Sequence, residues 1–183
     1  MHRVSRQRGA APRQVLVAAV AAVVAACSPT PPAAAPPSTT ALRDAHHGPF
    51  FPLCGGISDQ TVAELTGASG LVNTGQNPTG CQWLRGGVVW PRVTFAWYRG
   101  SPIGRERKIE QLSRTRVEDL TLEGRSGFRG VENNATLGDY ICEIAIQFFD
   151  DFIEWSVSFD VKPFPDPCPV TEELTRRSIA NAH

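Results

Sequence analysis

The most regular alternation of apolar and polar side chains in this chain runs from Cys142 to Phe159, and it predicts a β-hairpin. Residues 141–149 and 152–161 are its two expected strands, joined through Asp150 and Asp151. Successive side chains of a strand point to opposite faces of a sheet, so the apolar positions share one buried face. That face is expected to hold Cys142, Ile144, Ile146, Phe148, Ile153, Trp155, Val157 and Phe159, while Glu154, Ser156 and Ser158 point away. The hairpin therefore indicates an antiparallel sheet with one covered face.

The other patterns predict three helices beside this sheet, at residues 57–67, 103–116 and 169–182. Ser58 or Asp59 suits the N-cap of the first helix, and Gly67 suits its left-handed end. The residues expected to face the core from these helices are Val62, Leu65, Ile109, Leu112, Leu174 and Ile179. Pro169 lies in the first turn of the third helix, where a missing N–H costs little.

Further strands are expected at residues 81–84, 88–98 and within 120–128, with a turn at 73–80. Pro91 predicts a bulge or an edge position for the second of these strands, because proline cannot donate to a ladder. These elements together predict a single α+β domain, with an antiparallel sheet and about three flanking helices.

The N-terminal residues 1–26 have the character of a lipoprotein signal peptide. Four arginines and no acidic residue precede the apolar stretch from Val15 to Ala26, whose 12 residues are fewer than the ~20 that span a bilayer. The run Val24-Ala25-Ala26-Cys27 then resembles a lipobox. We expect cleavage before Cys27, lipidation of its sulfur, and attachment to the extracytoplasmic face of the cell membrane. The alternative is an ordinary signal peptide, in which Cys27 is one more thiol.

Residues 27–47 are expected to be the lipidated cysteine and a linker, because prolines, alanines and hydroxyl residues dominate there. Residues 48–183 then form the folded domain, whose 136 residues suit one domain. Removal of the signal takes four of the 18 basic residues and none of the 18 acidic ones, which leaves a net charge of −4. An exported chain of this charge lacks the electrostatic character of a nucleic-acid-binding protein.

Four further cysteines lie in the expected domain, an even number that indicates two disulfides in an exported protein. Cys142 begins a hairpin strand and Cys168 follows the hairpin closely, while Cys54 and Cys81 bracket the first helix. We therefore predict the pairs Cys54–Cys81 and Cys142–Cys168 among the three possible pairings. A metal site is not expected, since no C-x-x-C pair occurs and the histidines are all outside the expected core.

Four short segments form an ordered set that resembles a known family. They are Pro52-Leu53-Cys54-Gly55-Gly56, Gly80-Cys81-Gln82-Trp83, Cys142-Glu143-Ile144-Ala145-Ile146 and Asp166-Pro167-Cys168. The chain resembles the mycobacterial and actinobacterial lipoprotein family of unknown function that includes LprB and LprC. The resemblance covers nearly the whole expected domain. It implies a cell-envelope lipoprotein with paired cysteines, and it transfers no catalytic residue.

No residue set in the sequence indicates catalysis or a cofactor. A Ser-His-Asp mechanism has no positioned base, and the acidic pairs Asp150-Asp151 and Glu172-Glu173 are expected to be solvated. One region is strongly basic, because residues 99–116 carry an excess of four positive charges. Its residues Arg105, Arg107 and Lys108 are a candidate patch for anionic headgroups or an acidic partner, although the simpler interpretation is a solvated helix in which Glu106 and Glu110 pair with nearby basic residues.

The expected function is non-enzymatic: a lipid-anchored envelope protein that binds a partner or ligand outside the membrane. One alternative is a carrier of lipid or glycan, with Trp90, Trp97 and Trp155 lining an apolar pocket instead of filling the core. Another is an accessory subunit of an envelope transporter or enzyme, docked through an apolar patch near Phe50 and Phe51.

Overall fold

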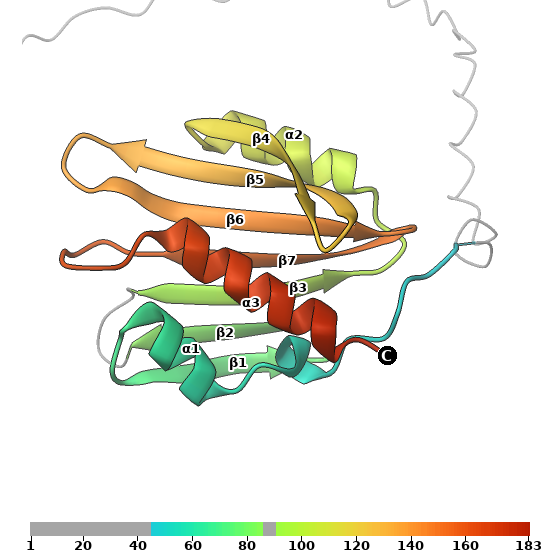
Figure 1. Cartoon of the computed structure of the whole chain (residues 1–183), viewed down its shortest axis with the longest axis horizontal. Helices are drawn as coiled ribbons and strands as arrows, with labels where there is room; N and C mark the ends of the chain where they lie inside the picture. Colours follow the sequence, from blue (N-terminus) through green and yellow to red (C-terminus); the bar gives the residue numbers. More distant parts are fainter. Residues whose placement is uncertain (1–44, 86–90) are drawn as a thin grey trace, which may run out of the picture. The chain divides into compact units, whose positions relative to one another are not determined.

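The structure is a computed structural model that describes residues 45–85 and 91–183 (Figure 1). The expected signal peptide, Cys27, most of the expected linker and Trp90 lie outside the described residues. The fold is built on one seven-stranded sheet in the order β1-β2-β3-β7-β6-β5-β4, with every neighbouring pair antiparallel. Its strands are β1 (Leu71–Asn77), β2 (Gly80–Arg85), β3 (Arg92–Tyr98), β4 (Arg116–Leu122), β5 (Arg125–Asn134), β6 (Gly138–Phe148) and β7 (Asp151–Ser158). The predicted α+β class and antiparallel sheet are confirmed.

The predicted hairpin is β6–β7, and it lies at the centre of the sheet. Ile144 pairs with Trp155 and Ile146 pairs with Ile153, so their side chains share one face. Both strands are paired on both edges, because β5 flanks β6 and β3 flanks β7. The face that carries these apolar residues is the covered face of the domain.

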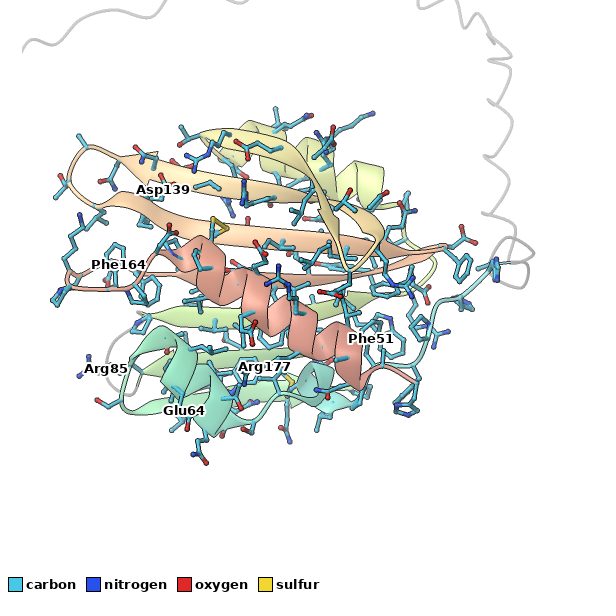
Figure 2. All side chains as sticks on the ribbon, in the orientation of Figure 1. Phe51, Glu64, Arg85, Asp139, Phe164 and Arg177 are labelled. Carbon is cyan, nitrogen blue, oxygen red and sulfur yellow. A yellow bond between two sulfur atoms is a disulfide. The ribbon has the colours of Figure 1, made fainter. Side chains whose placement is uncertain are left out.

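The covered face packs against α3 (Pro167–Asn181), α1 (Asp59–Thr66) and the short 3-10 helix η2 (Leu53–Gly56), which lie on the same side of the sheet in Figure 1. Its core is aromatic: the rings of Trp83 and Trp155 stack with centroids 5.6 Å apart. Trp97 and Trp155 are buried in this core, so they do not line an open apolar pocket. Phe51 is buried as well, and Figure 2 shows it near the end of α3.

Both predicted disulfides are present. Cys54–Cys81 joins η2 to β2 with a Cα–Cα distance of 5.3 Å, and Cys142–Cys168 joins β6 to the first turn of α3 with a distance of 5.1 Å. Each bond therefore fastens a covering element to the sheet. The caps of α1 also agree with the sequence, since Ser58 accepts a hydrogen bond from the Thr61 N–H and Gly67 adopts a left-handed conformation.

The helix α2 (Ile103–Ser113) packs on the opposite face, and here the sequence prediction was wrong. Ile109 and Leu112 were expected to face the core, but they are 46% and 89% exposed. Glu110 instead points inward and is only 5% exposed. Small residues of the sheet allow this orientation: a Cβ added at Gly130 on β5 would lie 3.3 Å from Glu110 Oε2.

Three strand predictions also need correction. Residues 73–80, expected as a turn, contain most of β1, whose polar outer edge gives little strand signal. The single strand expected within 120–128 is a hairpin that turns at Glu123 and Gly124, both at positive φ. Pro91 marks neither a bulge nor an edge strand, because it precedes the first paired residue of β3, and no ladder bond is lost.

The two acidic residues of the β6–β7 turn differ, although both were expected to be solvated. Asp151 is 1% exposed and accepts hydrogen bonds from the Gly48 and Gly100 N–H groups and from the His47 ring. Burial opposes its ionisation, but these hydrogen bonds outweigh burial and lower its pKa. Asp151 therefore fastens the start of the domain to the sheet and to the β3–α2 connection.

Candidate ligand-binding hollow

The face opposite α3 carries a polar surface that crosses the three central strands β3, β7 and β6. Paired residues form three successive rows on it, since each second residue of a strand points to the same side. The rows are Arg92–Ser158–Ile141, Thr94–Ser156–Glu143 and Ala96–Glu154–Ala145. A fourth row holds Tyr98 and Phe152, whose rings stack with centroids 4.3 Å apart. We call the space above these rows the polar hollow.

The hollow exists because its floor is made of small side chains. Thr94, Ala96, Ser156 and Ser158 leave space that the larger Arg92, Tyr98 and Arg114 border. Its volume is about 440 Å³. The helix α2 packs over the neighbouring strands β4 and β5, so the hollow lies beside this helix. The cavity is large enough for a small polar ligand or a segment of a larger one.

Arg114, at the end of α2, forms the strongest ionic contact at the hollow. Its Nε donates to Glu143 Oε2 at 2.6 Å and lies 2.9 Å from Glu110 Oε2. Ser156 donates to the other oxygen of Glu143 at 2.9 Å. Burial raises the pKa of Glu110, and the neighbouring Glu143 raises it further. Glu143 is also buried, but hydrogen bonds from Glu110, Arg114 and Ser156 outweigh this and lower its pKa.

Glu154 is the least satisfied polar group at the hollow. It comes from the middle of β7, and its Oε2 is shielded from solvent without a hydrogen-bond partner among the described residues. Burial, followed by the charges of Glu143 and Glu106, raises the pKa of Glu154 to about 8. At neutral pH this carboxyl is therefore mostly protonated, and it can donate to one ligand oxygen and accept from another polar group.

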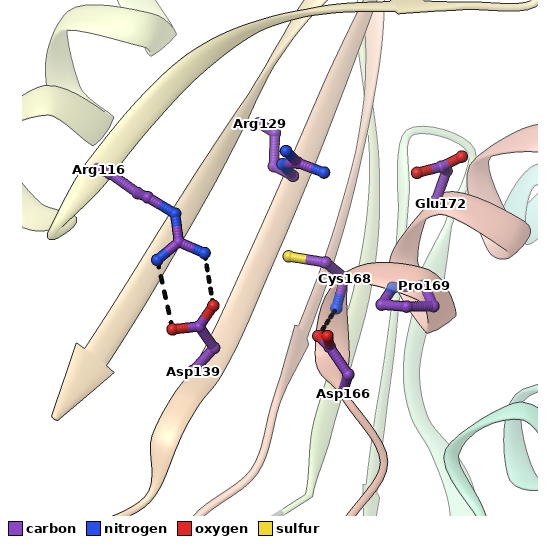
Figure 3. A pocket seen from close by; sticks show the side chains of 7 residues that line it. All are labelled: Arg116, Arg129, Asp139, Asp166, Cys168, Pro169 and Glu172. Carbon is purple, nitrogen blue, oxygen red and sulfur yellow. Dashed lines mark hydrogen bonds and ion pairs between the residues drawn. The ribbon is translucent and has the colours of Figure 1, made fainter. Parts of the chain in front are cut away.

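A second, smaller cavity of about 210 Å³ lies on the covered side, beside the Cys142–Cys168 bond (Figure 3). Its two arginines are already paired: Arg116 binds Asp139 with both terminal nitrogens, and Arg129 lies 2.7 Å from Glu118. Such ion pairs hold strand ends together and neutralise charge, although Arg129 Nε is shielded from solvent without a hydrogen-bond partner among the described residues. Among the described residues no group of His, Cys, Asp and Glu side chains is arranged to hold a metal ion.

The three residues of the candidate basic patch do not act together. Arg107 turns toward the sheet, where Nη1 lies 2.5 Å from Asp119 Oδ1 and the guanidinium lies over the Phe128 ring. Arg105 and Lys108 are exposed on the outer side of α2. The expected apolar patch is similarly divided, since Phe50 is 52% exposed while Phe51 is buried.

The sequence alone does not reveal the hollow, although the alternation in the hairpin predicts the correct face for Glu154, Ser156 and Ser158. Polar residues on the uncovered face of a hairpin are ordinarily exposed to solvent. What the sequence does not show is that β7 is the central strand and that β3 adds Arg92, Thr94 and Tyr98 beside it. Glu154, Ser156 and Ser158 form part of the hollow only because β3 pairs with β7.

Fold and site together define a disulfide-bonded α+β domain with a polar hollow on the sheet face opposite α3. The chain belongs to the family described as "Protein of unknown function (DUF3558)", whose profile matches residues 22–181. It is 62% identical over 145 residues to "Putative lipoprotein LprB" of Mycobacterium bovis, which covers 79% of this chain and 78% of that protein. The protein of the same name from Mycobacterium leprae is 62% identical over 140 residues, 76% of this chain and 74% of its own length.

These relatives confirm the resemblance that the cysteine-containing segments indicated, and they identify the chain as related to lipoproteins. Neither their name nor the family description states an activity. No solved structure matches the chain significantly. In the part of the chain that the structure describes, none of the helices has the length and apolar character needed to cross a membrane.

Proposed function

We propose that this protein is a lipid-anchored envelope protein whose domain binds a hydroxyl-rich ligand, such as a glycan, in the polar hollow without transforming it. The signal at residues 1–26 and Cys27 supply the anchor, and the linker carries the domain away from the extracytoplasmic surface of the membrane. The name of the LprB relatives supports the lipoprotein part of this proposal.

The observation that carries the ligand proposal is the buried Glu154 Oε2 without a partner in a cavity floored by small polar side chains. A buried polar atom that lacks a hydrogen bond is costly, and a ligand that supplies one removes this cost. Thr94 and Ser156 add hydroxyl groups, and Tyr98 adds an aromatic ring at the border. Sugar hydroxyls both donate and accept hydrogen bonds, which matches this mixture of groups.

A lipid-tail carrier fits the structure less well. Most large apolar side chains are packed in the core of the covered face, and the hollow is bordered by arginine, glutamate and hydroxyl groups. An acyl chain in the hollow would leave these polar groups without partners.

The test is a printed array of neutral, acidic and amino-sugar oligosaccharides, probed with the chain from Ser28 onward. Ala96→Phe should abolish binding because the new ring fills the floor of the hollow, whereas Ala180→Phe on the exposed side of α3 should leave it unchanged. An array without any bound oligosaccharide, or equal binding by both variants, contradicts the proposal.

The anchor has a separate test. Mass spectrometry of the protein extracted from membranes should find a diacylglycerol-modified N-terminal Cys27, and Cys27→Ser should release the protein from the membrane fraction. An unmodified Cys27 in the membrane-extracted protein contradicts the anchoring part alone.

A further inference from the structure

The helix α2 has an inner and an outer side of different chemistry. Glu110 and Arg107 point inward, where they contact Arg114 and Asp119 respectively. The outer side presents residues at the spacing i, i+3, i+4 and i+7, which lie on one stripe of a helix. These residues are Arg105, Lys108, Ile109 and Leu112, and all four are exposed. We call them the outer stripe of α2.

The outer stripe combines two features that seldom coincide on an exposed helix. Leu112 is the most exposed of the large hydrophobic side chains in the described residues, and Ile109 is nearly half exposed. Arg105 and Lys108 lie on the same stripe, and neither forms an ion pair with a described residue. A helix with apolar and basic residues on one surface is typical of contacts with a membrane interface.

We propose that the outer stripe of α2 docks on an anionic lipid surface, with Arg105 and Lys108 against the headgroups and Ile109 and Leu112 entering the interface. This proposal rests on the proposed anchor only for the nearness of a membrane. The mature chain has a net charge of −4, so the chain as a whole is repelled by anionic lipid. The basic residues of α2 are attracted, and this asymmetry orients the domain.

Docking through this stripe has a consequence for the hollow. The stripe and the polar hollow belong to the same face of the sheet, since α2 packs over β4 and β5 beside the hollow. A docked domain therefore turns the hollow toward the headgroup layer and turns α3 away from it. Ligands that project from the membrane surface would then meet the hollow directly.

The experiment uses the chain from Ser28 onward, which lacks the acyl anchor and contains every residue that the structure describes. Sedimentation with vesicles of phosphatidylcholine, alone or mixed with an equal part of phosphatidylglycerol, measures binding. We expect binding to the mixed vesicles that weakens at high salt, because salt screens headgroup attraction. Binding to the neutral vesicles should be at least roughly tenfold weaker.

Two double variants separate charge from apolar contact. Arg105→Glu with Lys108→Glu should weaken binding by roughly tenfold or more, and Ile109→Ser with Leu112→Ser by several-fold. The control is Arg85→Glu with Lys162→Glu, which changes the net charge equally at exposed positions outside α2 and should reduce binding much less. Circular dichroism confirms that each variant is folded.

Equal binding to both vesicle types, or equal losses in the control and in the α2 variants, overturns the proposal. The proposal is also overturned if vesicles do not bind and a partner protein is found whose binding is abolished by Leu112→Ser. In that case the outer stripe contacts a protein. Failure of vesicle binding with intact binding on the oligosaccharide array refutes only the docking surface, and the reverse result refutes only the ligand proposal.

Discussion

The two faces of the central strands are built from alternate residues of the same segments, yet they differ completely. On the covered face Trp155 is fully buried, stacks on Trp83 and donates through Nε1 to Ser178 of α3 at 2.9 Å. On the other face its neighbour Glu154 has a shielded oxygen without a partner. The covered face is filled mainly with apolar side chains, although Trp97 Nε1 and Arg129 Nε are buried there without a hydrogen-bond partner among the described residues. The other carries unsatisfied groups and open space, which is the combination that a ligand site requires.

This contrast separates stability from function. Both disulfides and three covering elements fasten the first face. The second face keeps three glutamates, Glu110, Glu143 and Glu154, near one another at a cost in free energy. Loss of contacts on the first face should therefore destabilise the protein, whereas removal of the Glu154 charge on the second face should increase its stability.

The largest effect is expected for the bond between α3 and the hairpin. Replacing both Cys142 and Cys168 by alanine should lower the free energy of unfolding by about 2–5 kcal/mol, because the bond restricts the unfolded chain and holds α3 on β6. Denaturant unfolding measures this loss. Membrane association of the full chain should not change, since the proposed anchor is on Cys27. Equal unfolding midpoints for the parent and the double variant would contradict the role of this bond.

A stabilising effect is expected at Glu154. Its pKa is raised in the folded state from near 4.5 to about 8, so the folded protein binds the proton more tightly than the unfolded chain. The contribution of Glu154 to the free energy of unfolding is therefore greatest below about pH 4.5 and falls as the pH rises to 8. Glu154→Gln cannot ionise and should be more stable than the parent by about 2–4 kcal/mol at pH 8.

The difference between Glu154→Gln and the parent should shrink steadily as the pH is lowered toward 4.5, in denaturant unfolding at each pH. The matched control is Glu64→Gln on the exposed side of α1, where Figure 2 shows the side chain at the edge of the molecule. A gain in stability in this control equal to that of Glu154→Gln would contradict the assignment to Glu154. A parent that is as stable as Glu154→Gln at pH 8 would show that the carboxyl is solvated and that the second face is not strained.

The smallest effect on stability is expected for Leu112→Ser. A comparison with Leu174→Ala distinguishes an exposed leucine from a buried one. Leu112→Ser should change the free energy of unfolding by no more than about 0.5 kcal/mol, whereas Leu174→Ala in α3 should cost about 2–5 kcal/mol. Thermal unfolding of the two variants provides the comparison. A large loss for Leu112→Ser would mean that α2 buries the residues that the sequence pattern indicated.

The sequence predicted the covered face well because its signals are local. Alternation over 142–159 identifies the central hairpin, and cysteine positions near strand and helix starts identify both disulfides. The orientation of α2 could not be predicted in this way. Its pattern offers Ile109 and Leu112 to the core, but Arg114 at the end of α2 pairs both with Glu110 and with Glu143 of β6. A long-range ionic contact decides the orientation, and periodicity contains no information about it.

The polar hollow was beyond prediction for a related reason. Glu154 is separated from Tyr98 and Thr94 by more than 50 residues of sequence, and only the pairing of β3 with β7 brings them together. Alternation shows which side of a strand a residue occupies. It does not show which strand lies next to it, and a ligand site that spans three strands depends on that neighbour.

The central claim is that ligand binding belongs to the second face, and nuclear magnetic resonance tests it most directly. The chain from Ser28 onward is titrated with the oligosaccharide that binds most strongly on the array. We predict saturable shifts of the backbone amides of Thr94, Ala96, Glu154 and Ser156, which Ala96→Phe abolishes and Ala180→Phe preserves. Shifts confined to α3 and the cavity beside Cys168, or shifts that persist in Ala96→Phe, would contradict the account.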